Sequence, residues 1–100
     1  MHIITRRTLI EYADQNAQVR DELNTWYHIV KQAEWSDLND LHSDIPSADL
    51  IGDNHYVFNV KGNHYRLIAL VFFPTKRVYI RGIFIHAEYS KLSKKDILKL

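Results

Sequence analysis

The sequence predicts an α+β fold in which an N-terminal pair of helices packs on one face of a mostly antiparallel sheet. In the first half, apolar residues recur at the three- and four-residue steps of an amphipathic helix, whereas from residue 55 onward they alternate with a period of two. Links of only two or three residues separate the apolar stretches of the second half, which suits antiparallel neighbours. The chain has 100 residues, 46% of them hydrophobic, and we expect one domain over residues 1–100.

Two helices are expected before residue 36. Thr5 follows a short β-rich start and can cap a first helix over residues 6–16, where Asn16 breaks the pattern. A second helix is predicted over residues 17–35, because its apolar residues recur on one side. These residues are Val19, Leu23, Trp26, Tyr27 and Val30. The two helices should form a helical hairpin.

Residues 36–54 are expected to cross the surface as a connector. Ser36 can cap a short helix through Leu41, and Pro46 ends any helical pattern. Residues 52–54, with the sequence GDN, form a cluster typical of a turn.

Three strands are predicted in the second half, and their short links make them an antiparallel meander. They cover residues 55–61, 64–73 and 77–85. The tail after Ser93 can form one or two helical turns.

The composition excludes several kinds of site. The chain has no cysteine, so it has neither disulfides nor thiolate metal sites. Its six histidines are scattered without an H-E-x-x-H or H-x-x-E-H spacing, and we expect no metal and no cofactor. The first ten residues hold no long apolar region, and the longest apolar run, LIALVFF, is too short to span a membrane. We expect a soluble, cytoplasmic protein without a membrane partner.

The net charge of +1 hides an uneven distribution. Residues 1–54 hold four Lys or Arg and ten Asp or Glu, whereas residues 55–100 hold nine and two. The halves therefore carry −6 and +7. A basic half suggests an anionic partner such as RNA, although two halves of opposite charge can also simply attract each other.

The turn NVKGNHYRL, residues 59–67, gathers polar groups. If its Gly-Asn pair is a two-residue hairpin loop, Asn59 lies opposite Arg66 and Lys61 lies opposite His64. Directly opposed residues share a sheet face, so one face near the tip carries all four and the other is apolar. Such a polar face can be merely solvated. However, an arginine on a central strand favours a carboxylate or phosphate partner.

The stretch FIHAEYSK places a histidine, a carboxylate, a phenol and an ammonium close together. A three-residue link before the third strand would put its even-numbered residues on the face of Arg66, with His86 just beyond the strand end. A link of two or four residues would instead put Arg81 and Ile85 on that face. Arg81 can alternatively pair with an acidic side chain of the helices.

The combination of these stretches carries a resemblance. HYVFNVKGNHYRLIALVFF followed by VYIRGIFIHAEYSKL resembles the HigB toxins of type II toxin–antitoxin systems, within the RelE-like group of ribosome-dependent mRNA interferases. MHIITRRTLIEYA and KQAEW fit the same family. The resemblance implies a microbial RNase-like α+β fold and cleavage of mRNA on the ribosome. It also implies a HigA-like helix-turn-helix antitoxin as partner, with operator DNA bound only through that antitoxin.

The resemblance also implies roles for particular residues. Lys61 and Arg66 match basic positions near the scissile phosphate, His86 matches a catalytic basic residue, and Tyr89 and Lys91 fall in a substrate-contacting segment. The family pattern is THAEYD. This chain has Ile85 in place of its threonine and Ser90 in place of its aspartate, which puts full efficiency in question.

These residue types suit metal-free RNA cleavage by the 2′-hydroxyl. His86 can act as general acid or general base, and Arg66 can bind the phosphate oxygens with its fork of donors. Lys61 and Lys91 would hold the RNA backbone, and Tyr89 would stack on a base or assist proton transfer. Further candidates for RNA or phosphate binding are His64, Arg81 and Asn59. The alternatives are a non-catalytic RNA- or ribosome-binding module and a protein-interaction module that uses the same face.

Overall fold

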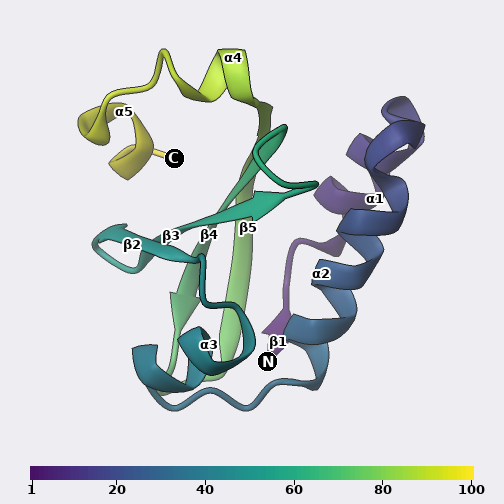
Figure 1. Ribbon diagram of the computed structural model, residues 1–100. Helices are drawn as coiled ribbons and strands as arrows, with labels where there is room; N and C mark the ends of the chain where they lie inside the picture. The colour runs from purple at the N-terminus through teal and green to yellow at the C-terminus, as the bar shows by residue number, and fades with distance from the viewer.

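The computed structural model describes residues 1–100, which form a five-stranded sheet with helices on both faces (Figure 1). The strand order is β1-β5-β4-β3-β2, and only the β1–β5 pair is parallel. The strands are β1 (His2–Ile3), β2 (Asp49–Gly52), β3 (His55–Val60), β4 (Tyr65–Phe72) and β5 (Arg77–Ile85). The predicted α+β class and mostly antiparallel sheet are confirmed.

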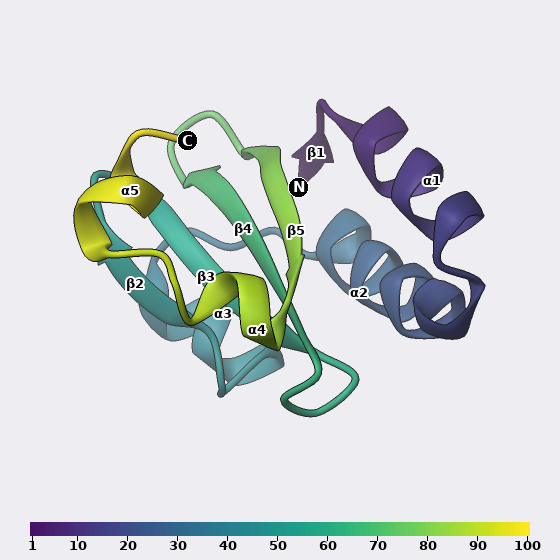
Figure 2. The same cartoon turned by 90° about the horizontal axis from the view of Figure 1, so that it is seen from above.

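The first half of the chain forms α1 (Arg6–Gln15), a 3₁₀ turn η1 (Ala17–Val19) and α2 (Arg20–Gln32). Figure 2 shows α1 and α2 together on one side of the sheet. Both bury apolar residues in a core that they share with β3, β4 and β5, because burial of these side chains outweighs the helices' modest propensity. The second helix is shorter than predicted, since the 3₁₀ turn replaces its first residues and Ala33 is already extended.

Thr5 does not cap α1 as predicted. Its hydroxyl makes no bond to the first turn of the helix. Instead, it accepts from the backbone N–H of Ile80 and donates to the carbonyl oxygen of the same residue. The hydroxyl therefore fastens the start of α1 to β5.

The connector contains more structure than predicted. Its helix is α3 (Leu38–Asp44). The capping residue is Asp37 and not Ser36 as predicted, because the Asp37 carboxylate accepts from the backbone N–H of Asp40. The four-residue strand β2 was not predicted. It lies at the sheet edge, where Leu50 is 48% exposed, so its buried and exposed residues do not alternate with a period of two. The predicted turn over residues 52–54 joins β2 to β3.

The β3–β4 hairpin has the predicted register. Asn59 pairs with Arg66, and Val60 pairs with Tyr65. Lys61, however, does not lie on the face of Arg66 as predicted. Its φ is +53°, which interrupts the alternation, and its ammonium donates to the carbonyl oxygen of Gln18 on the side of the helices (2.7 Å).

The link between β4 and β5 has the length of one alternative, but the strand end has the parity of the other. Phe72 pairs with Arg77, so the link has four residues, which alone would place odd-numbered residues of β5 on the face of Arg66. A β-bulge at Arg81 restores the other parity, and Arg66 pairs with Phe84. Even-numbered residues therefore share the face of Arg66 beside the strand end, and the chain leads directly into His86.

The C-terminal segment covers the second face of the sheet (Figure 2). It forms a one-turn helix α4 (His86–Tyr89), which was not predicted, and α5 (Lys94–Leu98), which was. Ile97 of α5 packs on Val57 and Ile68 in a small second core. None of the helices is long and apolar enough to cross a membrane.

Candidate active site

A pocket of about 450 Å³ opens where the tip of the β3–β4 hairpin meets the start of α4. The backbone N–H of His86 donates to the carbonyl oxygen of His64 (2.9 Å) and so closes the contact between the two segments. The pocket is lined by Lys61, His64, Tyr65, Ile85, His86 and Ala87. The fold thus brings together the two stretches that carry most of the predicted site.

Three of the predicted residues line this pocket. Lys61, His64 and His86 all have exposed side chains. The Lys61 ammonium is held by the Gln18 carbonyl, whereas neither imidazole has a hydrogen-bond partner within the chain. The imidazoles are therefore free to bind a ligand through either ring nitrogen.

The short helix α4 presents the catalytic candidates of the last segment. The Glu88 carboxylate accepts from the backbone N–H of Ile85 (3.0 Å) and so satisfies a donor at the start of the helix. The Ser90 hydroxyl donates to the carbonyl oxygen of Ala87 (3.0 Å) at its end. His86 and Tyr89 are three residues apart and therefore lie on one side of this helix.

Arg66 and Tyr89 form a pair next to the pocket. The guanidinium carbon of Arg66 lies 5.5 Å from the centre of the Tyr89 ring. One of its nitrogens donates to the carbonyl oxygen of Tyr65 (3.2 Å). Arg66 is half-buried and makes no ion pair, so most of its donors remain available. The sheet face that pairs Arg66 with Phe84 thus places it beneath α4 and not inside the pocket.

Besides Arg66 and Tyr89, three other predicted residues lie outside the pocket. Asn59 lines a separate groove between α2, α3 and the hairpin. Lys91 follows α4 with its side chain exposed and unpaired. Arg81 is the extra residue of the β-bulge, exposed and without an ion pair, so its alternative pairing with an acid of the helices is wrong.

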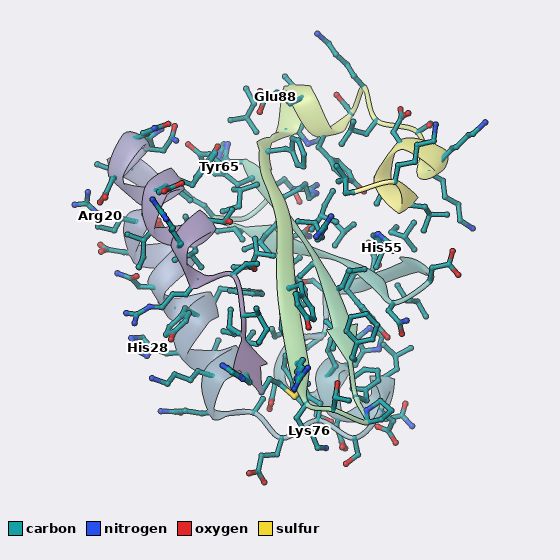
Figure 3. All side chains as sticks on the ribbon, turned by 180° about the vertical axis from the view of Figure 1, so that it is seen from behind. Arg20, His28, His55, Tyr65, Lys76 and Glu88 are labelled. Carbon is teal, nitrogen blue, oxygen red and sulfur yellow. The ribbon has the colours of Figure 1, made fainter.

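Tyr65 lines the pocket but was not predicted as a site residue. Strand alternation correctly placed its ring in the core beneath the helices, where it is 6% exposed. Its hydroxyl accepts a hydrogen bond from the side-chain amide of Gln18 (2.9 Å). A buried tyrosine at the end of a strand next to a polar tip was the one available signal. Figure 3 shows Tyr65 and Glu88 at the same end of the molecule.

The surroundings of Tyr65 connect the pocket to the N-terminal helices. The ring of Tyr12 meets the Tyr65 ring edge to face, with centroids 6.4 Å apart. Burial raises the pKa of Tyr12, and the nearby Tyr65 and Glu88 raise it further. The Tyr12 phenol therefore stays protonated at neutral pH, and its contact with Tyr65 brings α1 next to a residue of the pocket.

The pocket suits an anionic ligand. It holds one ammonium, two imidazoles and one phenol and no carboxylate, and the Glu88 carboxylate of α4 already accepts from a backbone N–H. No group of three or more His, Asp or Glu side chains is placed to hold a metal ion. Proton transfer and hydrogen bonding are thus the chemistry that these side chains can supply.

Comparison with known proteins identifies the family. The family model described as HigB toxin, the RelE-like toxic component of a toxin–antitoxin system, matches residues 9–92. The mRNA interferase toxin HigB of Escherichia coli K12 is 36% identical over 91 residues, which cover 89% of this chain and 88% of that protein. The mRNA interferase HigB of Escherichia coli O6:H1 is 31% identical over 96 residues, or 94% and 93%. The chain therefore belongs to the HigB family of RelE-like toxins of toxin–antitoxin systems.

Proposed function

We propose that this protein is an mRNA endoribonuclease toxin that inhibits translation by cleaving mRNA bound to the ribosome. Its relatives bear the name mRNA interferase, and the family is the toxic component of a toxin–antitoxin system. The observation that carries the proposal is the pocket at the hairpin tip, which both His86 and Lys61 line. The backbone hydrogen bond from His86 to His64 holds the start of α4 against this tip.

The proposed cleavage uses the substrate's own 2′-hydroxyl as nucleophile and needs no metal. A general base removes the proton of that hydroxyl, the oxygen attacks the adjacent phosphorus, and a general acid protonates the departing 5′ oxygen. The products are a 2′,3′-cyclic phosphate and a 5′-hydroxyl. His86 performs one of the two proton transfers, because imidazole exchanges protons near neutral pH.

The cationic groups would divide the binding of the phosphate and the RNA backbone. Arg66, with free donors beside α4, clamps the phosphate oxygens. Lys61 and His64 contact the backbone from the hairpin tip, where they line the pocket. Lys91, Arg81 and Asn59 lie farther out and serve as secondary contacts to the RNA or the ribosome.

The same proposal includes the fold family and the partners. We assign the chain, as one toxin domain over residues 1–100 with its helix pair on one sheet face, to the RelE-like microbial RNase fold. A HigA-like helix-turn-helix antitoxin would neutralise it, and the pair would reach operator DNA only through the antitoxin.

The test is cleavage of a defined mRNA on programmed ribosomes, with the fragment ends identified. We expect wild-type protein to leave a 2′,3′-cyclic phosphate and His86→Ala to lose about 100-fold or more of the rate. His28→Ala is the matched control, because His28 is an exposed histidine on α2 away from the pocket (Figure 3). Ribosome binding without cleavage by the wild type would favour the non-catalytic module, and full activity of His86→Ala would remove His86 from the mechanism.

A further inference from the structure

We propose that Tyr65 is a further catalytic residue, whose hydroxyl donates a hydrogen bond to a non-bridging oxygen of the scissile phosphate. This inference rests on the proposed ribonuclease function. Tyr65 is the one buried side chain among the six residues that line the pocket. It therefore offers a donor whose position is fixed by packing before the substrate arrives.

The orientation of the hydroxyl follows from its partner. The Gln18 amide nitrogen has only protons to offer, so the Tyr65 oxygen must accept in that bond. The phenolic proton consequently points elsewhere, and no acceptor of this chain takes it. A phosphate oxygen in the pocket would be such an acceptor.

Gln18 is itself held in place. Its backbone carbonyl accepts from the Lys61 ammonium (2.7 Å), which ties the 3₁₀ turn η1 to the hairpin tip. Its side chain then reaches the Tyr65 hydroxyl. Lys61, Gln18 and Tyr65 thus form one linked set, in which Gln18 is a positioning residue that sets the direction of the Tyr65 proton.

The surroundings of the Tyr65 ring hold its hydroxyl in a fixed position. Tyr12 packs against it edge to face, and Tyr65 closes the β3–β4 pairing opposite Val60. A hydroxyl on such a ring cannot swing away from the pocket without disturbing the core. Because the fixed hydroxyl needs little reorganisation, its hydrogen bond should strengthen as negative charge builds on the non-bridging phosphate oxygens.

The test compares variants in the mRNA-cleavage assay on ribosomes. Tyr65→Phe keeps the ring and removes only the hydroxyl, and we expect the rate to fall roughly 10- to 100-fold, as for loss of a bond to a charged group. Tyr12→Phe is the matched control, since it removes the hydroxyl of the neighbouring ring that does not line the pocket. Thermal melting of both variants near the wild-type temperature would show that packing is intact.

The role of Gln18 is tested by reversing its polarity. Gln18→Glu supplies an acceptor, which draws the Tyr65 proton away from the pocket, so the rate should fall by about as much as in Tyr65→Phe. If this effect passes through Tyr65, adding Gln18→Glu to Tyr65→Phe should cost little more. An equal further loss in the double variant would overturn the positioning role.

The possible failures are distinguishable. A wild-type protein that does not cleave would contradict the proposed function itself. A wild type that cleaves, with His86→Ala inactive and Tyr65→Phe within about twofold of wild type, would overturn the Tyr65 assignment alone. A fall in Tyr12→Phe equal to that in Tyr65→Phe would also overturn it, because the effect would then not be specific to the hydroxyl in the pocket.

Discussion

The backbone N–H of His86 donates to the carbonyl oxygen of His64 at 2.9 Å, and this bond joins the last strand to the tip of the β3–β4 hairpin. It fixes the first residue of α4 against a segment some twenty residues earlier in the chain. The position of His86 therefore depends on how firmly α4 itself is formed. α4 has only one turn, so its capping determines how often it is open.

Ile85→Thr should strengthen α4. Ile85 occupies the capping position but has no side-chain acceptor, while Glu88 already accepts from its N–H. A threonine could accept from the Glu88 N–H and complete a capping box, worth about 0.5–2 kcal/mol. We expect slower hydrogen exchange of the Ser90 N–H, which donates to the His86 carbonyl, and a cleavage rate equal to or above wild type.

Ile85→Val is the matched control for this change, because it keeps the β-branched shape without an acceptor. It should leave the exchange of the Ser90 N–H unchanged. Unchanged exchange in Ile85→Thr as well would mean that α4 gains nothing from a side-chain cap.

Lys76→Met should lower stability without affecting cleavage. The Lys76 ammonium donates to the carbonyl oxygens of Glu34 and Trp35 and to the Ser36 hydroxyl, and so holds the loop after α2. Figure 3 shows Lys76 at the end of the molecule opposite Tyr65. Losing these bonds should cost about 1–3 kcal/mol. The melting temperature of a domain this size should then fall by roughly 4–8 °C per kcal/mol.

Lys95→Met serves as the comparison, since Lys95 is exposed on α5 and makes no side-chain hydrogen bond or ion pair. Its melting temperature should match wild type. Cleavage at 25 °C should be the same for both variants and wild type. A melting temperature of Lys76→Met equal to that of Lys95→Met would show that the three bonds exchange with water at no net cost.

Asp96 predicts an acid-sensitive C-terminal helix. Hydrogen bonds from the backbone N–H and the hydroxyl of Ser93 lower the pKa of the Asp96 carboxyl below its ordinary value of 3.8, and nearby Lys99 acts in the same direction. Because the folded pKa lies below the unfolded one, the carboxylate stabilises α5 fully above the ordinary pKa. That contribution is lost as the pH falls through the lowered value.

Nuclear magnetic resonance between pH 5 and pH 2 would follow this loss through the Ser93 N–H, which donates to the Asp96 carboxylate (3.0 Å). Asp96→Asn should remove the acid-dependent step. Asp53→Asn, an exposed aspartate of the β2–β3 turn, should leave it in place. The same step in both variants would assign it to another carboxyl group.

The sequence predicted one half of the candidate site well and the other poorly. In the β3–β4 hairpin, a symmetrical loop and clean alternation made the pairing of Asn59 with Arg66 a matter of counting. The β5 side could not be counted, because the parity set by the four-residue link is reversed by the bulge at Arg81. Gly82 was the only hint of the bulge in the sequence, because an isolated glycine within a strand often marks one. In the structure, a Cβ at this position would lie only 2.6 Å from the Phe84 ring.

The remaining misses have local causes. Lys61 does not lie on its predicted face because its own backbone is left-handed, a conformation that lysine seldom adopts. α4 and β2 have four residues each, which is too short for any hydrophobic period to appear. Tyr65 was assigned to the core correctly, but the route of its hydroxyl to Gln18 and the pocket depends on tertiary packing that no local pattern encodes.

Tyr89 should act through its ring and not through its hydroxyl. The Arg66 guanidinium lies over this ring at 5.5 Å, which fits a platform that holds the arginine below α4. Tyr89→Phe keeps the platform, and we expect cleavage within about twofold of wild type. Tyr89→Leu removes it and should lower the rate about 10-fold, since a desolvated cation–π contact contributes up to about 2 kcal/mol. Arg66→Lys should lose more, because it loses the planar fork that binds phosphate in two places.

The contrary outcome for Tyr89 is equally specific. If Tyr89→Phe and Tyr89→Leu lose the same large factor on ribosomes, the hydroxyl takes part in proton transfer or binds the RNA directly. A double-mutant cycle separates these roles. In the Arg66→Ala background, a residue that only supports the arginine has nothing left to support, so adding Tyr89→Leu should cause little further loss of cleavage rate. A full additional loss there would show that Tyr89 contacts the substrate independently of Arg66.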